Sequence, residues 1–233
     1  MTNIEHITAL VSGANRGLGR RFAEQLVARG AKVYGGARRP ESIDLPGVIP
    51  VPLDITDLES IRRAAALAGD VNVLVNNAGV STRAGLLDGS LEDIRLEMDT
   101  NYFGTLSMIR EFVPVIERNI DGDDSASGAI LNVLSVLSWL HPAASGAYSA
   151  AKAASWAMTD AVREELAPRG IHVSALHVGY MDTDMVSDIP AGLKTDPAVV
   201  AELALDGLFA GAAEILGDEL TRTVKSQLSG SRS

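Results

Sequence analysis

A tyrosine and a lysine stand four residues apart in the segment Tyr148-Ser-Ala-Ala-Lys152. On a helix this spacing places both side chains on one face, within reach of each other. A free phenol has a pKa of about 10, so proton transfer near neutral pH requires a fall of about three units, or roughly 4 kcal/mol in favour of the phenolate. The ammonium group of Lys152 can supply part of that preference. The pair therefore predicts an acid and base for a reaction that moves a proton.

A glycine-rich turn, SGANRGLG, occupies residues 12–19 directly after the first expected strand. Glycines let the backbone turn tightly and approach a pyrophosphate, and the helix that follows offers unpaired N–H groups and the positive end of its dipole. Glycine occurs in tight turns of every kind, so a glycine cluster alone is weak evidence. Its position directly after the first strand is what favours a phosphate-binding turn. This pattern predicts a dinucleotide phosphate cradle made of Gly13, Asn15, Arg16, Gly17, Leu18 and Gly19.

The second expected strand ends in Gly35-Gly36-Ala37-Arg38-Arg39 and carries no acidic residue there. NAD-binding folds place a carboxylate at this point for the adenosine ribose, whereas NADP-binding folds place a cation for the 2′-phosphate. Guanidinium groups suit phosphate because their donors form a fixed fork. We therefore expect NADP(H), held by Arg16 and Arg38, and interpret Arg39 as a solvated surface residue.

These groups must be positioned by βα units, because short β-branched runs alternate with longer helical stretches. Residues 1–233 are expected to form one α/β domain, a Rossmann-like doubly wound parallel sheet with helices on both faces. Every strand is expected to be buried on both faces. Residues 181–197 follow the last strand, and we interpret them as a substrate lid, with an ordinary surface connection as the alternative. The expected strands are 8–11, 32–35, 49–52, 73–75, 129–133 and 172–177, and the expected helices are 18–29, 57–68, 90–118, 149–167 and 197–210.

Composition excludes several classes of function. A formal charge of −10 disfavours nucleic acid and anionic membranes as partners. The absence of cysteine excludes disulfides, thiolate metal sites and a cysteine nucleophile. The histidines show no metal-ligand spacing, so no metal is expected, although His141 is a candidate for the edge of a substrate pocket. Residues 1–11 lack the pattern of a signal peptide, and no apolar run reaches the roughly 18 residues of a membrane span. A cytoplasmic protein is expected.

Five motifs follow one another along the chain: the glycine turn at 12–19, Asp54-Ile55-Thr56, Asn76-Asn77-Ala78-Gly79, Asn101 in the segment DTNYFG, and Tyr148 with Lys152. With these motifs the whole chain resembles the short-chain dehydrogenase/reductase family. The departures from the family pattern are Ser12 for threonine, Leu134 for the commoner serine and Val178 for proline.

The resemblance implies further site residues. The catalytic serine falls at Ser135, 13 residues before Tyr148, with Ser138 as the competitor. Asn101 would position a water that passes a proton toward Lys152, which holds the cofactor ribose. Thr183, after Val178-Gly179, would bond the nicotinamide carboxamide. The cofactor would also contact Asp54, Ile55, Asn77, Ala78, Gly79 and Gly179.

The resemblance implies an NADP(H)-dependent oxidoreductase that reduces a ketone or aldehyde, or oxidises an alcohol, with Tyr148 as acid and base. An NAD-dependent alcohol dehydrogenase and a non-catalytic dinucleotide sensor are the alternatives. A small-molecule substrate is the expected partner, and a homodimer or homotetramer the expected assembly. Apolar residues that flank the chemistry predict an apolar pocket: Val80, Leu137, Trp139, Tyr180, Met181 and Met185.

Overall fold

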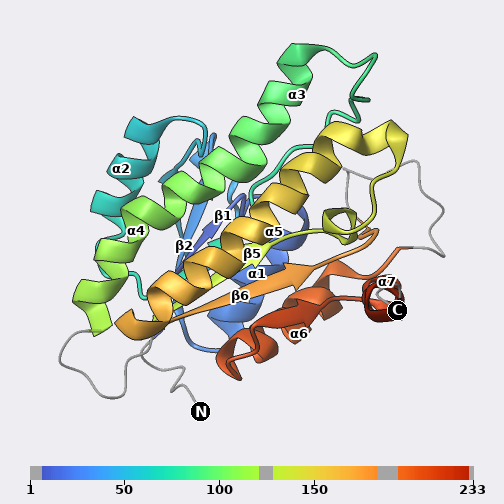
Figure 1. Cartoon of the computed structure of the whole chain (residues 1–233). Helices are drawn as coiled ribbons and strands as arrows, with labels where there is room; N and C mark the ends of the chain where they lie inside the picture. Colours follow the sequence, from blue (N-terminus) through green and yellow to red (C-terminus); the bar gives the residue numbers. More distant parts are fainter. Residues whose placement is uncertain (1–6, 121–127, 183–193, 231–233) are drawn as a thin grey trace.

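The computed structural model describes residues 7–120, 128–182 and 194–230. In this part of the chain, seven parallel strands form one sheet in the order β3-β2-β1-β4-β5-β6-β7 (Figure 1). All six expected strands are present, each within two residues of its expected bounds, and a seventh is added. The strands are β1 (Thr8–Ser12), β2 (Lys32–Ala37), β3 (Val48–Pro52), β4 (Val73–Asn76), β5 (Gly128–Val133), β6 (Ile171–His177) and β7 (Glu214–Leu216).

The expectation that every strand is buried on both faces is wrong for β3. This strand lies at the edge of the sheet, and three of its five residues are exposed. Pro50 and Pro52 lack the N–H groups that a further neighbour would need, which suits an edge position. The central strands β1 and β4 are buried throughout apart from the first residue of β1.

Helices cover both faces of the sheet, as the doubly wound fold requires (Figure 1). Two of them pack apolar residues on one face: α1 (Gly17–Ala28) and α6 (Pro197–Phe209). Three others build the second core on the opposite face: α2 (Leu58–Leu67), α4 (Thr105–Ile120) and α5 (Gly146–Leu166). No helix in the described ranges has the length and apolar character needed to cross a membrane.

The long helix expected over residues 90–118 is interrupted. The structure has α3 (Leu91–Met98), a π-helical segment η3 (Asp99–Gly104) and then α4. A wide π turn shifts the backbone register, and the main-chain oxygen of Asn101 accepts hydrogen bonds from two hydroxyls, those of Thr105 and Ser155, each at 2.9 Å. Helical periodicity alone does not distinguish this interruption from a continuous helix.

The C-terminal elements β7 and α7 (Glu219–Gly230) were not expected from the sequence. The strand has only three residues, and the helix carries a polar sequence with few apolar positions. Both gain their stability from tertiary contacts, because β7 pairs with β6 and α7 packs Val224 beside Trp139.

The sheet topology creates one crevice for a ligand. The strand order reverses between β1, which continues to β2, and β4, which continues to β5. Loops at the carboxyl ends of these two strands diverge toward opposite faces, so a crevice opens between them. The glycine turn follows β1, and the Asn77-Ala78-Gly79 turn follows β4. The fold therefore brings both predicted cofactor motifs to the same place.

Candidate active site

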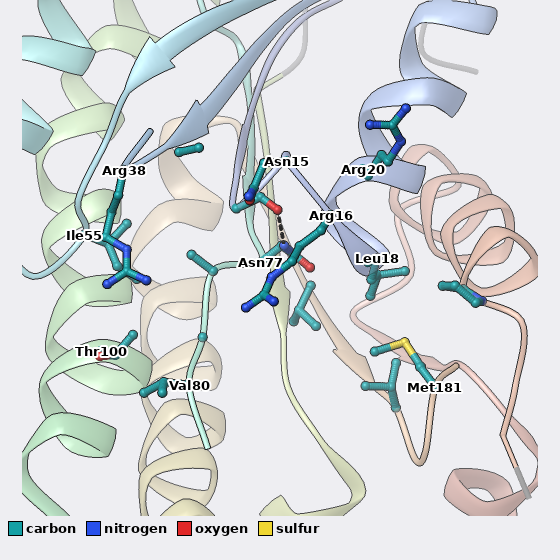
Figure 2. Close-up of a pocket in the computed structure, with 18 of the residues that line it drawn as sticks. Asn15, Arg16, Leu18, Arg20, Arg38, Ile55, Asn77, Val80, Thr100 and Met181 are labelled. Atoms are coloured by element: carbon teal, nitrogen blue, oxygen red, sulfur yellow. Dashed lines mark hydrogen bonds between the residues drawn. The ribbon is translucent and has the colours of Figure 1, made fainter. Parts of the chain in front are cut away.

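A pocket of about 610 Å³ opens at the carboxyl ends of the strands. Figure 2 shows side chains reaching it from the glycine turn, from the end of β2 and from the loop that follows β6. Its lining includes most of the predicted cofactor residues: Gly13, Asn15, Arg16, Gly17, Leu18, Arg38, Asp54, Ile55, Asn77, Ala78, Gly79, Tyr148 and Lys152.

The glycine turn is shaped for close approach. Gly13 and Gly17 have φ angles of +68° and +55°, a backbone region that side chains disfavour. A Cβ atom on Gly19 would lie 2.2 Å from the carbonyl oxygen of Gly13 and 2.4 Å from Nδ2 of Asn77, so only glycine fits there. The N-cap of α1, Arg16, makes no side-chain cap. The first N–H groups of α1 are therefore suited to an anion.

The serine that replaces threonine at position 12 keeps the hydroxyl that the turn uses. Ser12 Oγ donates to the carbonyl of Val75 at 3.3 Å and accepts from the N–H groups of Asn77 and Ala78, each at 3.0 Å. Asn77 Nδ2 returns a bond to the carbonyl of Ser12 at 2.9 Å. The turns after β1 and β4 are thus tied together without the threonine methyl.

A second, polar hollow of about 250 Å³ adjoins the glycine turn and the end of β2. Three arginines, Arg16, Arg38 and Arg39, line it beside Asn15 and Ser42. Figure 2 shows Arg16 and Arg38 entering from different elements. No carboxylate of the described residues lines this hollow. It is suited to a phosphate, and Arg39, interpreted from the sequence as a surface residue, belongs to its lining.

The reacting residues meet at the other end of the pocket. Tyr148 and Lys152 stand one turn apart on α5, with Nζ of Lys152 5.6 Å from the centre of the Tyr148 ring. The hydroxyl of Ser135 lies close enough to the phenol of Tyr148 to oppose the rise of its pKa. Ser135 begins the short turn after β5, where its Oγ accepts from the N–H of Leu137. Ser138, the competing serine, is buried and its hydroxyl finds no partner among the described residues.

The electrostatics of Tyr148 differ from the sequence expectation. Burial, together with the charge of Glu97, raises the pKa of its phenol above the ordinary value, and the hydrogen bond with Ser135 opposes this rise. The ammonium of Lys152 lies 5.6 Å from the centre of the Tyr148 ring and donates to the carbonyl of Val133 at 2.9 Å, and its lowering of the phenol pKa stays a prediction. Burial lowers the pKa of Lys152 itself to about 8. The arrangement favours a protonated phenol, the form that an acid needs.

Glu97 is a site residue that sequence reasoning missed. Its side chain is fully buried, one carboxylate oxygen accepts from both the N–H and the hydroxyl of Thr82, and the other oxygen has no hydrogen-bond partner among the described residues. A buried, half-satisfied carboxylate beside a catalytic candidate is costly and often functional. Its only sequence signal is an acidic residue four positions before Asn101.

Asn101 lies behind the pocket wall. Its amide donates to the carbonyls of Val80 and Glu97 at 2.8 and 2.9 Å, and its side-chain oxygen faces the N–H of Val80 at 3.3 Å. The same oxygen would lie 2.8 Å from a Cβ atom on Gly79. Asn101 therefore fixes the loop after β4 against the π-helical segment.

The loop after β6 reaches the pocket through Val178, Met181 and Asp182. Gly179 donates its N–H to the buried carboxylate of Asp218, a second residue that sequence reasoning missed. Thr183 and Met185 lie outside the described residues, as does most of the expected lid. The two ends of that lid lie side by side, because Met181 forms a bridge with Thr195.

Three residues expected in an apolar pocket do not line it, and one of them, Tyr180, is exposed. Trp139 is buried against Trp156 and His177, and Leu137 packs into the same cluster. They point away from the chemistry because the turn after Ser135 directs them toward α7. Val80 and Met181 do line the pocket. His141 is exposed and lines neither of the two hollows described here.

Comparison with known proteins agrees with this geometry. The short chain dehydrogenase family pattern matches residues 7–194. The NADPH-dependent 1-acyldihydroxyacetone phosphate reductase of Schizosaccharomyces pombe is 32% identical over 82% of this chain, which spans 64% of that relative.

Two solved structures extend the comparison. A short chain dehydrogenase from Burkholderia cenocepacia in complex with NADP is 38% identical with a TM-score of 0.91, over 99% of this chain and 95% of that one. The 3-ketoacyl-(acyl-carrier-protein) reductase from Brucella melitensis, complexed with NADH, is 27% identical with a TM-score of 0.82, over 92% and 95% of the two chains. From its family match, its fold and its site, this chain belongs to the short chain dehydrogenase family of oxidoreductases.

Proposed function

We propose that this chain is an NADP(H)-dependent oxidoreductase that reduces a ketone or aldehyde, or oxidises the corresponding alcohol, with Tyr148 as general acid and base. The observation that carries the proposal is that Tyr148 and Lys152, with Ser135 beside the phenol, share a pocket with the glycine cradle, and that three arginines line the adjoining hollow. A phenol and a neighbouring hydroxyl can each donate a hydrogen bond to the same carbonyl oxygen.

The residues present fit a nicotinamide dinucleotide. The start of α1 lines the pocket at Gly17 and Leu18, where its first N–H groups could hold a pyrophosphate, and the cavity has the volume of a cofactor site. When bound, the cofactor supplies the hydride. The chain's own groups orient the substrate, exclude water and handle the proton.

Each reacting residue has a defined task in reduction. Tyr148 delivers a proton to the substrate oxygen as negative charge grows there, and its raised pKa keeps that proton in place beforehand. Ser135 stabilises the same oxygen by a hydrogen bond. Lys152, whose ammonium donates to the carbonyl of Val133, would hold the cofactor ribose. Asn101 positions the loop at Val80 and, through the π turn, the water path toward Lys152.

NADP(H) is preferred over NAD(H) in this proposal. Arginines rather than a carboxylate line the hollow beside β2, and a relative at 38% identity was solved with NADP. The alternative, an NAD-dependent alcohol dehydrogenase, gains some support from the more distant relative complexed with NADH. Titration with both nucleotides separates the two, because arginine contacts to a 2′-phosphate should favour NADPH by about 10-fold or more.

The substrate is proposed to be an apolar carbonyl compound, because Val80, Leu96 and Met181 are apolar residues that line the same pocket as Tyr148. The deciding experiment follows NADPH oxidation with a panel of aldehydes and ketones of increasing size. Turnover that requires Tyr148 is expected. If the folded chain binds NADPH with no turnover on any member, the non-catalytic sensor is the better reading.

A homodimer or homotetramer of this chain remains a prediction. Small residues at positions 150, 151, 153, 154 and 157 allow α5 to approach another helix closely. Light scattering at micromolar concentration measures the mass of the particle in solution. A mass equal to that of one chain would reject the predicted oligomer.

A further inference from the structure

A buried histidine stands directly behind the active-site serine. His177 ends β6, is fully buried, and places Nδ1 3.3 Å from the main-chain oxygen of Ser135. Its ring stacks on Trp139 at 3.9 Å between centroids and 21° between planes. The oxygen of Ser135 can only accept a hydrogen bond, so Nδ1 is the donor.

This contact completes the hydrogen bonding of the Ser135 carbonyl. The oxygen also accepts from the N–H of Ser138 at 2.9 Å, so both of its lone pairs are used. The next residue, Val136, donates to the carbonyl of Val178 at 2.8 Å. On the other side of the serine, Leu134 donates to the carbonyl of Leu176 at 2.7 Å. The backbone that carries the Ser135 hydroxyl is therefore held by two flanking main-chain bonds and by one side chain, that of His177.

The far side of His177 faces the C-terminal elements. Nε2 lies 3.4 Å from Oε1 of Glu214 on β7 and has no hydrogen-bond partner among the described residues, so this contact is an ion pair only when both ring nitrogens carry a proton. His177 and Lys225 hold the pKa of Glu214 at about 2, against the opposing effect of burial. Lys225 on α7 reaches the two oxygens of Glu214 at 2.6 and 2.8 Å and lies 4.9 Å from the ring of Trp139.

A chain of contacts thus runs from α7 to the chemistry: Lys225 to Glu214, Glu214 to His177, and His177 to the Ser135 turn. We propose that His177 is a positioning residue for Ser135, and that Glu214 and Lys225 hold it in place from the C-terminal segment. The inference rests on the proposed catalytic role of Ser135. His177 touches the serine backbone rather than the reacting atoms, so it acts through geometry.

Two isosteric replacements of His177 test this directly. In His177→Asn the side-chain amide can donate from near the position of Nδ1, whereas in His177→Gln it donates from near the position of Nε2. We expect kcat to stay near the wild-type value in the Asn variant and to fall about 10-fold in the Gln variant, because small misplacements of a reacting group are costly. KM for NADPH should not change in either variant.

A merely structural role gives a different pattern, in which both variants lose kcat alike or neither does. Either outcome would overturn the proposal. His172→Gln is the matched control, because His172 lies on the same strand and contacts Ser174 and Ala212 instead of the active site. It should leave kcat unchanged.

Tryptophan emission gives a readout that needs no turnover. The chain has two tryptophans, and both Trp139 and Trp156 lie in this cluster. If His177 holds the Ser135 turn, quenching of emission by acrylamide should rise in His177→Gln and Glu214→Gln and remain at the wild-type level in His177→Asn. Equal quenching in all three variants would contradict the inference.

The two proposals can fail separately. If wild-type protein gives no turnover with any substrate, the proposed function fails, while the quenching series still decides whether His177 holds the turn. If turnover depends on Tyr148 and Ser135 but the Asn and Gln variants behave alike, only the positioning role fails.

Discussion

The two ends of the pocket are built differently. At the reaction end, Ser135 and Lys152 are buried, and each is hydrogen-bonded to protein backbone. At the adenosine end, Arg38 and Arg39 are exposed and extend from the end of one strand. The first end is held from several elements at once, whereas the second relies on a few long side chains.

This difference separates chemistry from selectivity. A residue that moves a proton must be held within a fraction of an ångström, which explains the layers of contacts behind Tyr148. A residue that attracts a phosphate works through charge and tolerates motion. Changes at the reaction end should therefore lower turnover with either nucleotide, while changes at the adenosine end should alter the choice of nucleotide.

The largest effect is expected from Tyr148→Phe. Removing the hydroxyl deletes the proton donor, so kcat with NADPH should fall by about 10²–10⁴-fold, while NADPH binding changes little. Tyr180→Phe is the control, because Tyr180 is exposed beyond the pocket lining. Stopped-flow NADPH oxidation measures both. Near-normal turnover in Tyr148→Phe would reject the assignment of the acid.

Arg38→Asp should act only through the adenosine end. Loss of a charge-assisted contact and gain of a repulsive carboxylate should weaken NADPH by about 10–100-fold and leave NADH within a few-fold. Arg39→Asp is the neighbouring control in the same hollow, and it should change the ratio of NADPH to NADH affinity less than Arg38→Asp does. Binding titrations with both nucleotides measure the ratio of the two affinities. Equal losses for NADPH and NADH would show that Arg38 does not contact the 2′-phosphate.

The sequence predicted the cradle and the reacting pair because both depend on local spacing. The glycines of residues 13–19 and the one-turn separation of Tyr148 and Lys152 are fixed within a single βα connection or helix. Ser135 followed from its distance to Tyr148. The structure brings Gly13, Gly17, Tyr148 and Lys152 to one pocket, with Ser135 beside Tyr148.

Other features depend on contacts between distant segments. Glu97 meets Thr82, and Asp218 meets Gly179, pairs that no local pattern reveals. The strand β7 has three residues and exists because β6 offers it an edge. The hydrogen bond from Lys152 to the carbonyl of Val133, 19 residues earlier in the chain, is another contact that the local spacing did not reveal.

The pH dependence of cofactor binding at Lys152 tests the difference between the two ends of the pocket without changing which nucleotide is preferred. Its pKa of about 8 means that the amine is charged at pH 7 and loses its proton as pH rises through 8. Charge-assisted hydrogen bonds are roughly twice as strong as neutral ones. The dissociation constant for cofactor should therefore rise a few-fold between pH 7 and pH 9.

Because Lys152 lies at the reaction end, this rise should be the same for NADPH and NADH. Fluorescence titration across pH measures it, and Lys152→Met should flatten the profile for both nucleotides. A rise seen for NADPH alone would assign the titrating group to the adenosine end and contradict the prediction.

The smallest effect is expected from Glu97→Gln. Gln keeps an oxygen that can accept hydrogen bonds from Thr82, but it removes the buried negative charge. That charge is the second cause, next to burial of the phenol, of the raised pKa of Tyr148. Alcohol oxidation requires the phenolate, so its rate rises with pH through the pKa of the phenol. Removing the negative charge lowers that pKa, and the rise should move to lower pH by up to about one unit.

The pH dependence of kcat/KM for alcohol oxidation measures this change, and Glu92→Gln on the exposed face of α3 is the control. A profile that stays in place in Glu97→Gln, while the variant remains folded and active, would show that the buried carboxylate only fastens the Thr82 loop. A displacement toward higher pH would contradict the sign of the interaction. The expected displacement would make Glu97 part of the reaction end, where the surrounding structure sets the acidity of one phenol.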